Sequence, residues 1–149
     1  MIYCRQKTIW EGEVLLIITR ETDYALRVLR AISDKELHNV KEITDSQMLP
    51  QAFTYKIIKK LSNAGILEII RGATGGCHLT SDLSQLSLYD LMEAVEESSD
   101  LSACMDESYD CPWRKAHGGC AMHCHLFQIQ EKLNQELRSC NLRQLLNAP

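Results

Sequence analysis

The stretch that decides the fold is residues 50–80, PQAFTYKIIKKLSNAGILEIIRGATGGCHLT. Its first half predicts an amphipathic helix, because apolar side chains recur at helical spacing. Pro50 suits the first turn of that helix, since proline lacks only an amide hydrogen that the turn leaves unpaired. Phe53, Ile57 and Leu61 would face inward. The opposite face, which carries lysines, would remain in solvent.

The second half of the stretch predicts a small hairpin. Gly65 is placed to end the helix in the left-handed conformation, which glycine adopts without strain. Two short strands, 66–71 and 77–80, would then be joined by the glycine-rich tip 72–76. An exposed helix followed by such a hairpin is typical of a winged helix-turn-helix.

The segments on either side of this stretch predict further helices. Upstream, apolar residues at helical spacing indicate a helix from about Thr22 to Asp34, and Asn39 with Glu42 has the spacing of a capping box. Downstream, Ser87 with Asp90 caps a fourth helix in the same way. The fold class is therefore mainly α with a small β wing.

Charge is unevenly distributed along a chain whose formal net charge is -4. Residues 50–80 hold four basic residues and one acid, whereas residues 81–111 hold nine acids and no base. A small basic surface beside an acidic one can still bind phosphates, because the field decays within about 10 Å at ordinary salt. The net charge therefore does not exclude double-stranded DNA as a partner.

The helix within residues 50–80 is the expected reader of DNA, because a helix fits the major groove. Arg71, at the start of the wing tip, would contact phosphate or the minor groove, and the glycines let the backbone approach the DNA. The alternative interpretation is a solvated helix face and an ordinary hairpin turn. The expected contact residues are Gln51, Thr54, Tyr55, Lys56, Lys59, Arg71, Gly75 and Gly76.

The cysteines indicate a reducing compartment, expected to be the cytoplasm. The chain has seven cysteines, an odd number, and its longest N-terminal apolar run is too short for a signal peptide. In such a compartment a cysteine cluster is more often a metal or redox site than a disulfide framework. No apolar stretch approaches the roughly 20 residues that span a bilayer, which argues against a transmembrane role.

Three stretches resemble the IscR/NsrR family of bacterial regulators, also called the Rrf2 family. They are ITRETDYALRVLRAI at 18–32, KIIKKLSNAGILEIIRGATGGCHL at 56–79 and SLYDLMEAVE at 87–96. The resemblance covers roughly residues 18–146. It implies a homodimeric winged-helix regulator, with a long dimerisation helix and three cysteines that can hold an iron-sulfur cluster of the 2Fe-2S or 4Fe-4S type.

The cysteines singled out for that cluster are Cys104, Cys111 and Cys120. They stand in a loop that enters the last long helix, and a loop lets three soft thiolate ligands converge on iron. The segment CAMHCHLFQIQEKL at 120–133 resembles the part of the family that begins at its third cluster cysteine. The gap between Cys111 and Cys120 is longer than the family usually shows, and Cys124 is an additional thiol.

A fourth ligand is left open by three cysteines. His123 follows Cys120 by three residues, so a helix would place both on one face, and the resemblance implies a histidine at this point in some members. Asp23, which the family sometimes uses, could reach across from the partner subunit, and Cys124 ranks third. A zinc site, or a cluster-free regulator controlled by thiol oxidation or a partner protein, is the alternative.

An enzyme is not expected. A cysteine nucleophile assisted by His117, His123 or His125 would be required, and the sequence has no C-x-x-C redox pair or phosphate-binding loop to support one.

The last helix, from about Cys120 to Arg138, has an apolar seam suited to a partner helix or to its own core. Three parts are expected: a tail at 1–17, a winged helix-turn-helix domain at 18–86, and a cysteine-rich sensing loop with a dimerisation helix at 87–149. The seam consists of Leu126, Ile129, Leu133, Leu137 and Cys140.

Overall fold

The structure is a computed structural model that describes residues 18–96 and 100–147. The tail expected at 1–17 lies outside the described residues. The elements are α1 (Arg20–Ala31), α2 (Val40–Gln47), α3 (Gln51–Asn63), β1 (Leu67–Ile70), β2 (Gly76–Leu79), α4 (Leu88–Val95), a short 3-10 turn (Ala103–Met105), α5 (Pro112–His117), α6 (Ala121–Ser139) and α7 (Leu142–Leu146).

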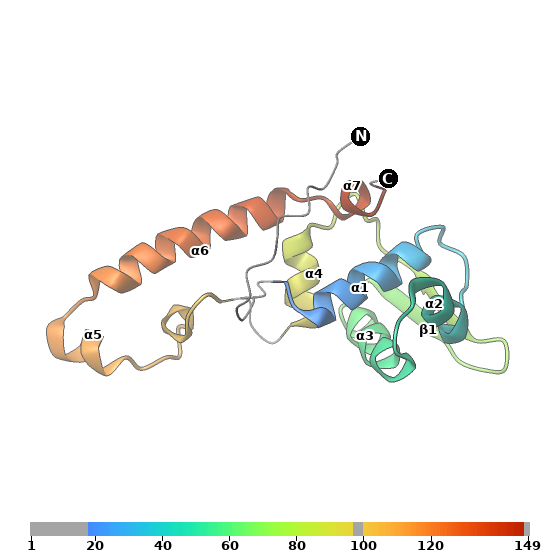
Figure 1. Cartoon of the computed structure of the whole chain (residues 1–149), viewed down its shortest axis with the longest axis horizontal. Helices are drawn as coiled ribbons and strands as arrows, with labels where there is room; N and C mark the ends of the chain where they lie inside the picture. Colours follow the sequence, from blue (N-terminus) through green and yellow to red (C-terminus); the bar gives the residue numbers. More distant parts are fainter. Residues whose placement is uncertain (1–17, 97–99, 148–149) are drawn as a thin grey trace, which may run out of the picture.

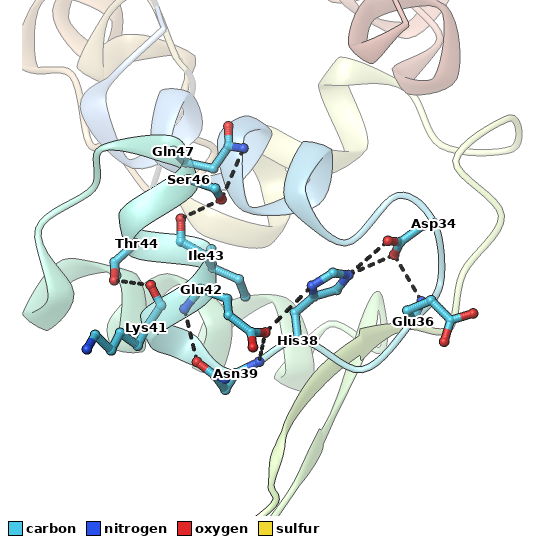
Figure 2. Close-up of polar contacts among 10 residues, drawn as sticks. All are labelled: Asp34, Glu36, His38, Asn39, Lys41, Glu42, Ile43, Thr44, Ser46 and Gln47. Atoms are coloured by element: carbon cyan, nitrogen blue, oxygen red, sulfur yellow. Dashed lines mark hydrogen bonds and ion pairs between the residues drawn. The ribbon is translucent and has the colours of Figure 1, made fainter.

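Helix α2 begins with the capping box expected from the sequence. The Asn39 side chain accepts a hydrogen bond from the Glu42 amide at 2.9 Å, and the Glu42 carboxylate accepts one from the Asn39 amide at 3.0 Å. Figure 2 shows this pair beside the ring of His38, which lies between the carboxylates of Asp34 and Glu42. The hydrogen bond with His38 holds the pKa of Asp34 below its ordinary value. These contacts fix the turn that leads into the helix-turn-helix.

Helix α3 buries Ile57 and Leu61 as predicted, but not Phe53. Pro50 is its N-terminal cap, and Gly65, just after its end, has a φ of 73° as expected. Phe53 was predicted to point inward, but its side chain is 52% exposed and meets the ring of Tyr24 edge-on. The buried face consists of Thr54, Ile57, Ile58 and Leu61.

The hairpin pairs β1 with β2 in antiparallel register, with Leu67 opposite Leu79 and Ile70 opposite Gly76. The strand β2 also pairs with the loop before α2. The backbone groups of His38 and Cys77 exchange hydrogen bonds of 3.0 and 2.9 Å. The wing is therefore attached to the helix-turn-helix by backbone pairing as well as by the chain that joins them.

One apolar core joins the two segments that the sequence analysis separated at residue 86. Side chains from α1, α2, α3 and the wing pack with Leu91, Met92 and Val95 of α4, and with Leu137 and Leu142 from the chain's end. The capping box of Ser87 and Asp90 at the start of α4 is present as predicted. The short helix α7 was not anticipated.

The long helix α6 leaves this core and extends to one side, with α5 at its far end and α1, α2 and α3 on the other side of the molecule (Figure 1). Only its last turns pack on α4, where Arg138 lies 4.1 Å from the ring centre of Tyr89. The segment before α6 was expected to be irregular, yet it contains α5, with Pro112 in the first turn and Gly118 at its end. Within the described ranges, no helix is long and apolar enough to cross a membrane.

Candidate DNA interface and cysteine cavity

A groove of about 410 Å³ separates the start of α3 from the wing, and several of the expected DNA contacts line it. Gln51 and Tyr55 come from α3, while Arg71, Gly75 and Gly76 come from the hairpin. Tyr55 and Arg71 are exposed. Their convergence brings polar side chains from two elements to one surface.

Lys41 and Lys59 add positive charge to this surface. Lys59 lines an adjoining cavity of about 530 Å³ together with Tyr55 and Arg71. Lys41, from the first turn of α2, lines the groove itself and is exposed. It was missed by the sequence analysis, although its place two residues after the Asn39 cap was a usable signal. Three cations therefore border the groove.

Thr54 does not belong to this surface, which corrects the sequence-based prediction. Its side chain is 0% exposed, and its hydroxyl donates a hydrogen bond to the Pro50 carbonyl at 3.1 Å. A side chain in that position packs the helix against the core and has no access to a base. The error follows from placing Phe53 on the buried face.

Lys56 is exposed on α3 and forms an ion pair with Glu21 of α1. Lys60, one turn further along, binds the other carboxylate oxygen of the same residue. These two hydrogen-bonded ammonium groups hold the pKa of Glu21 below its ordinary value. The carboxylate orients Lys56 and would compete with a phosphate for it.

The two wing glycines are required by contacts within the chain. A Cβ atom on Gly75 would lie 2.3 Å from the Ile70 carbonyl oxygen, and one on Gly76 would lie 2.3 Å from that of His38. Both distances are shorter than van der Waals contact, so neither position can accept a Cβ atom without a shift of the backbone. Any side chain here would push the wing away from its own strand or from the loop before α2.

At the far end of the molecule, a cavity of about 510 Å³ lies between the loop, α5 and the start of α6. Cys104, Cys111, Cys120 and His123, four of the predicted ligands, all line it. The three thiols are free and half-buried. Cys120 also caps α6, because its sulfur accepts a hydrogen bond from the His123 amide at 3.4 Å.

His123 and Arg114 form the polar side of this cavity. Arg114 Nη1 lies 3.3 Å from His123 Nε2, and Arg114 Nη2 lies 3.5 Å from the Tyr109 carbonyl oxygen. The Nδ1 atom of His123 is buried and has no hydrogen-bond partner among the described residues. An orphaned buried nitrogen is costly unless something binds it.

The cavity gathers these donors without bringing them to ligand distance of one another. Across residues 18–96 and 100–147, no three cysteine, histidine, aspartate or glutamate side chains are placed to hold a metal ion. Cys124 is exposed and does not line the cavity. Asp23 lies on α1, paired with Arg27 at 3.1 Å, and borders a different cavity.

The thiols differ in the reactivity that we expect of them. Burial raises the pKa of Cys77 in the wing to about 11, so it remains a thiol at neutral pH. Iodoacetamide at about pH 8, close to the ordinary thiol pKa, should therefore modify exposed Cys124 and leave Cys77 unmodified. Peptide mass spectrometry of the native protein would measure this. Rapid labelling of Cys77 without unfolding would contradict its burial in the wing.

A helix-turn-helix with a two-stranded wing, followed by a long projecting helix, defines the class of winged-helix proteins. The comparisons with known proteins identify the family. The model of the Rrf2 family, described as iron-dependent transcriptional regulator, matches residues 18–148. The chain belongs to the Rrf2 family, and the resemblance inferred from the sequence is confirmed.

Curated relatives agree with this assignment. Protein aau3 of Rhizobium meliloti is 32% identical over 98 residues, which is 64% of each chain. The HTH-type transcriptional regulator NsrR of Bacillus subtilis is 30% identical over 92 residues, 60% of this chain and 63% of the relative. NsrR of Geobacillus kaustophilus is 30% identical over 128 residues, 81% of each chain. The match thus spans just under two thirds of the first two relatives.

Solved structures confirm the predicted fold class. The structure of CymR, titled the global cysteine regulator of B. subtilis, has a TM-score of 0.64 and 22% identity, and covers 89% of this chain and 97% of its own. IscR of T. potens has a TM-score of 0.61 and 19% identity, with 91% and 89% covered. At these identities the likeness concerns the fold. The family is one of transcription regulators, in agreement with the expectation that the chain is not an enzyme.

Proposed function

We propose that the chain is a homodimeric repressor that binds a DNA operator through α3 and the wing, and senses an iron-sulfur cluster through the cysteine cavity. The observation that carries the proposal is that one winged-helix chain has two separate sites. Gln51, Tyr55 and Arg71 line the groove at one end, and three thiols line the cavity at the other. A DNA partner also implies that the protein works in the cytoplasm.

DNA binding rests on the groove between α3 and the wing. Tyr55 and Gln51 are exposed on the face that would enter a major groove, where glutamine pairs with adenine. Arg71 stands at the end of β1, beside a tip that only glycine can form at Gly75. Lys41, which lines the groove, and Lys59, which lines the adjoining cavity, add positive charge for phosphate contacts.

Arg71→Ala is expected to weaken operator binding and to lower the salt dependence of the affinity by about one unit of slope, since one cationic contact no longer releases counterions. The operator would be selected from a pool of random duplexes, and titrations at several salt concentrations would give the slope. Lys115→Ala, at an exposed lysine on α5 that does not line the groove, is the control for loss of a charge. An Arg71 variant with an unchanged slope would remove the wing from the interface.

The residues of the cavity fit an iron-sulfur cluster by their chemistry. Three half-buried thiols supply soft ligands, and the buried Nδ1 of His123 has no partner among the described residues. When bound, the cluster would supply a redox- and iron-dependent group held by Cys104, Cys111, Cys120 and His123. These donors would have to come closer together to hold it, because no three of them are placed for a metal ion among the described residues.

Anaerobic purification, followed by absorption spectroscopy and by iron and sulfide analysis, would distinguish a regulator that binds a cluster from one that does not. Brown protein with equal iron and sulfide supports the cluster. Colourless protein that contains zinc, or none of these elements, rejects it in favour of zinc binding or thiol oxidation.

Dimerisation rests on the projecting part of α6. Met122 and Ile129, seven residues apart and therefore on one face of the helix, are large apolar side chains that the chain's own core leaves exposed. An apolar helix face of this kind is characteristic of an interface with another helix. A second copy of the same chain covers it most simply, because a two-fold axis pairs the same face with itself.

A further inference from the structure

His123, the histidine proposed as a ligand, already has a partner at one of its two ring nitrogens. The Nη1 atom of Arg114 lies 3.3 Å from His123 Nε2, in a partly buried contact, and both residues line the cysteine cavity. A guanidinium has N–H donors and no acceptor, so a hydrogen bond between these atoms requires Nε2 to accept. The lone pair of Nε2 is therefore occupied by Arg114 and is not available to a metal ion.

The same hydrogen bond determines which ring nitrogen carries the proton. A neutral imidazole has one N–H and one acceptor nitrogen, and the hydrogen bonds of the ring decide between the two tautomers. Because Nε2 accepts from Arg114, the proton is on Nδ1. This is the buried nitrogen that has no hydrogen-bond partner among the described residues. Neither nitrogen of His123 can bind iron while Arg114 is bound to the ring.

Arg114 is held beside His123 by the local structure of α5. Its backbone carbonyl accepts the hydrogen bond from the Gly118 amide that ends the helix, at 2.9 Å, and its Nη2 atom lies 3.5 Å from the Tyr109 carbonyl oxygen. None of the residues that line the cavity is acidic, so no carboxylate there draws the guanidinium away from the ring. The next residue, Lys115, instead pairs with Asp110 at 2.6 Å outside the cavity.

We propose that Arg114 is a positioning residue that keeps His123 from binding metal until the guanidinium leaves the ring. The proposal rests on the function proposed above, in which His123 is a ligand. Binding through Nε2 requires Arg114 to withdraw from that atom. Binding through Nδ1 requires the proton to move to Nε2, where it would face an N–H of Arg114, donor against donor. Both routes break the same hydrogen bond, so the thiols can take up a metal ion before His123 does.

The first test reads the tautomer of His123 in the metal-free chain by nitrogen NMR at about pH 8, where an ordinary imidazole is neutral. The wild-type ring should carry its proton on Nδ1, and His123→Ala identifies the signals. Arg114→Met removes the donor and should let the ring exchange between the two tautomers. Arg114→Lys keeps an N–H donor and should restore much of the wild-type state. A wild-type ring with its proton on Nε2, or an Arg114→Met ring identical to the wild-type ring, would overturn the proposal.

The second test measures the binding of cobalt(II) under anaerobic conditions, because cobalt accepts thiolate and imidazole ligands and its visible absorption responds to them. His123→Ala should weaken binding in the wild-type chain and should weaken it by about tenfold more in the Arg114→Met chain. In that chain, binding through His123 no longer breaks a hydrogen bond with a charged donor. An equal loss of affinity in both chains would overturn the role of Arg114.

Lys115→Met is the matched control, because it removes the same charge from the next residue, outside the cavity. It should keep the wild-type tautomer and the wild-type effect of His123→Ala. Neither Arg114 nor His123 belongs to the apolar core, so these variants should fold. A wild-type chain that binds neither cobalt nor iron would overturn the sensing function, and the role of Arg114 with it. An unexpected tautomer in a chain that binds metal would overturn the role of Arg114 alone.

Discussion

Cys120→Ser is expected to abolish iron binding while leaving the protein folded. Serine keeps the cap of α6, because its oxygen can accept the hydrogen bond that the Cys120 sulfur now accepts from the His123 amide. It removes the soft thiolate that iron requires. Loss of an outer-shell partner alone typically weakens metal binding by about 10- to 100-fold, and loss of a direct ligand should exceed this. Iron per protomer and thermal unfolding would be measured together.

Cys124→Ser is the matched control for that variant. Cys124 lies one turn further along the same helix, is exposed, and does not line the cavity. Its replacement should leave iron stoichiometry unchanged. If Cys124→Ser lost iron and Cys120→Ser retained it, Cys124 rather than Cys120 would be the iron ligand.

Ile129→Asp is expected to convert the proposed dimer to a monomer. Ile129 is 53% exposed in the single chain, so the substitution leaves the protomer's own core intact. A carboxylate buried without a partner in an apolar interface costs several kcal/mol, and each 1.4 kcal/mol is a tenfold change in affinity. The dimer should therefore weaken by about two orders of magnitude or more, as sedimentation or light scattering would detect.

Two further substitutions calibrate this result. Gln128→Asp adds the same charge at the neighbouring exposed position and should have a much smaller effect if Ile129 lies in the interface. Leu137→Asp should unfold the protomer, since Leu137 belongs to the chain's own core. If Ile129→Asp remained a dimer, the face of α6 that carries Ile129 would not be the dimer interface.

Local signals predicted the winged-helix part well. The capping pairs beginning at Asn39 and Ser87 and the left-handed Gly65 are all present, because each depends on a few adjacent residues. On α3, Ile57 and Leu61 are buried as predicted, whereas the prediction for Phe53 was wrong, because its bulky apolar side chain suggested a core position. Thr54 can be buried because its hydroxyl donates a hydrogen bond to the Pro50 carbonyl oxygen. Hydropathy alone does not predict such a hydrogen bond.

The distal region was harder to predict from the sequence. Helix α5 is only one and a half turns long, too short for a periodic apolar pattern, although Pro112 and Gly118 marked its two ends. The helix α6 is present as predicted, but the sequence did not show which residues of its apolar seam meet the protomer's own core. Leu133 and Leu137 pack against the protomer's own core, whereas Ile129 does not. Which residues of the seam reach the core depends on where α6 ends and α7 begins, at Asn141.

The position of Trp113 gives the protein an intrinsic optical reporter. Its indole lines the cysteine cavity, stacks on His117 with ring centres 3.9 Å apart, and is 61% exposed. Iron-sulfur clusters absorb in the near ultraviolet, where tryptophan emits, so a bound cluster would quench Trp113 by energy transfer. The sequence has one other tryptophan, Trp10, so the tryptophan emission of a Trp10→Phe chain would come from Trp113 alone. Its fluorescence would then follow the filling of the cavity in real time, during DNA binding and without an added dye.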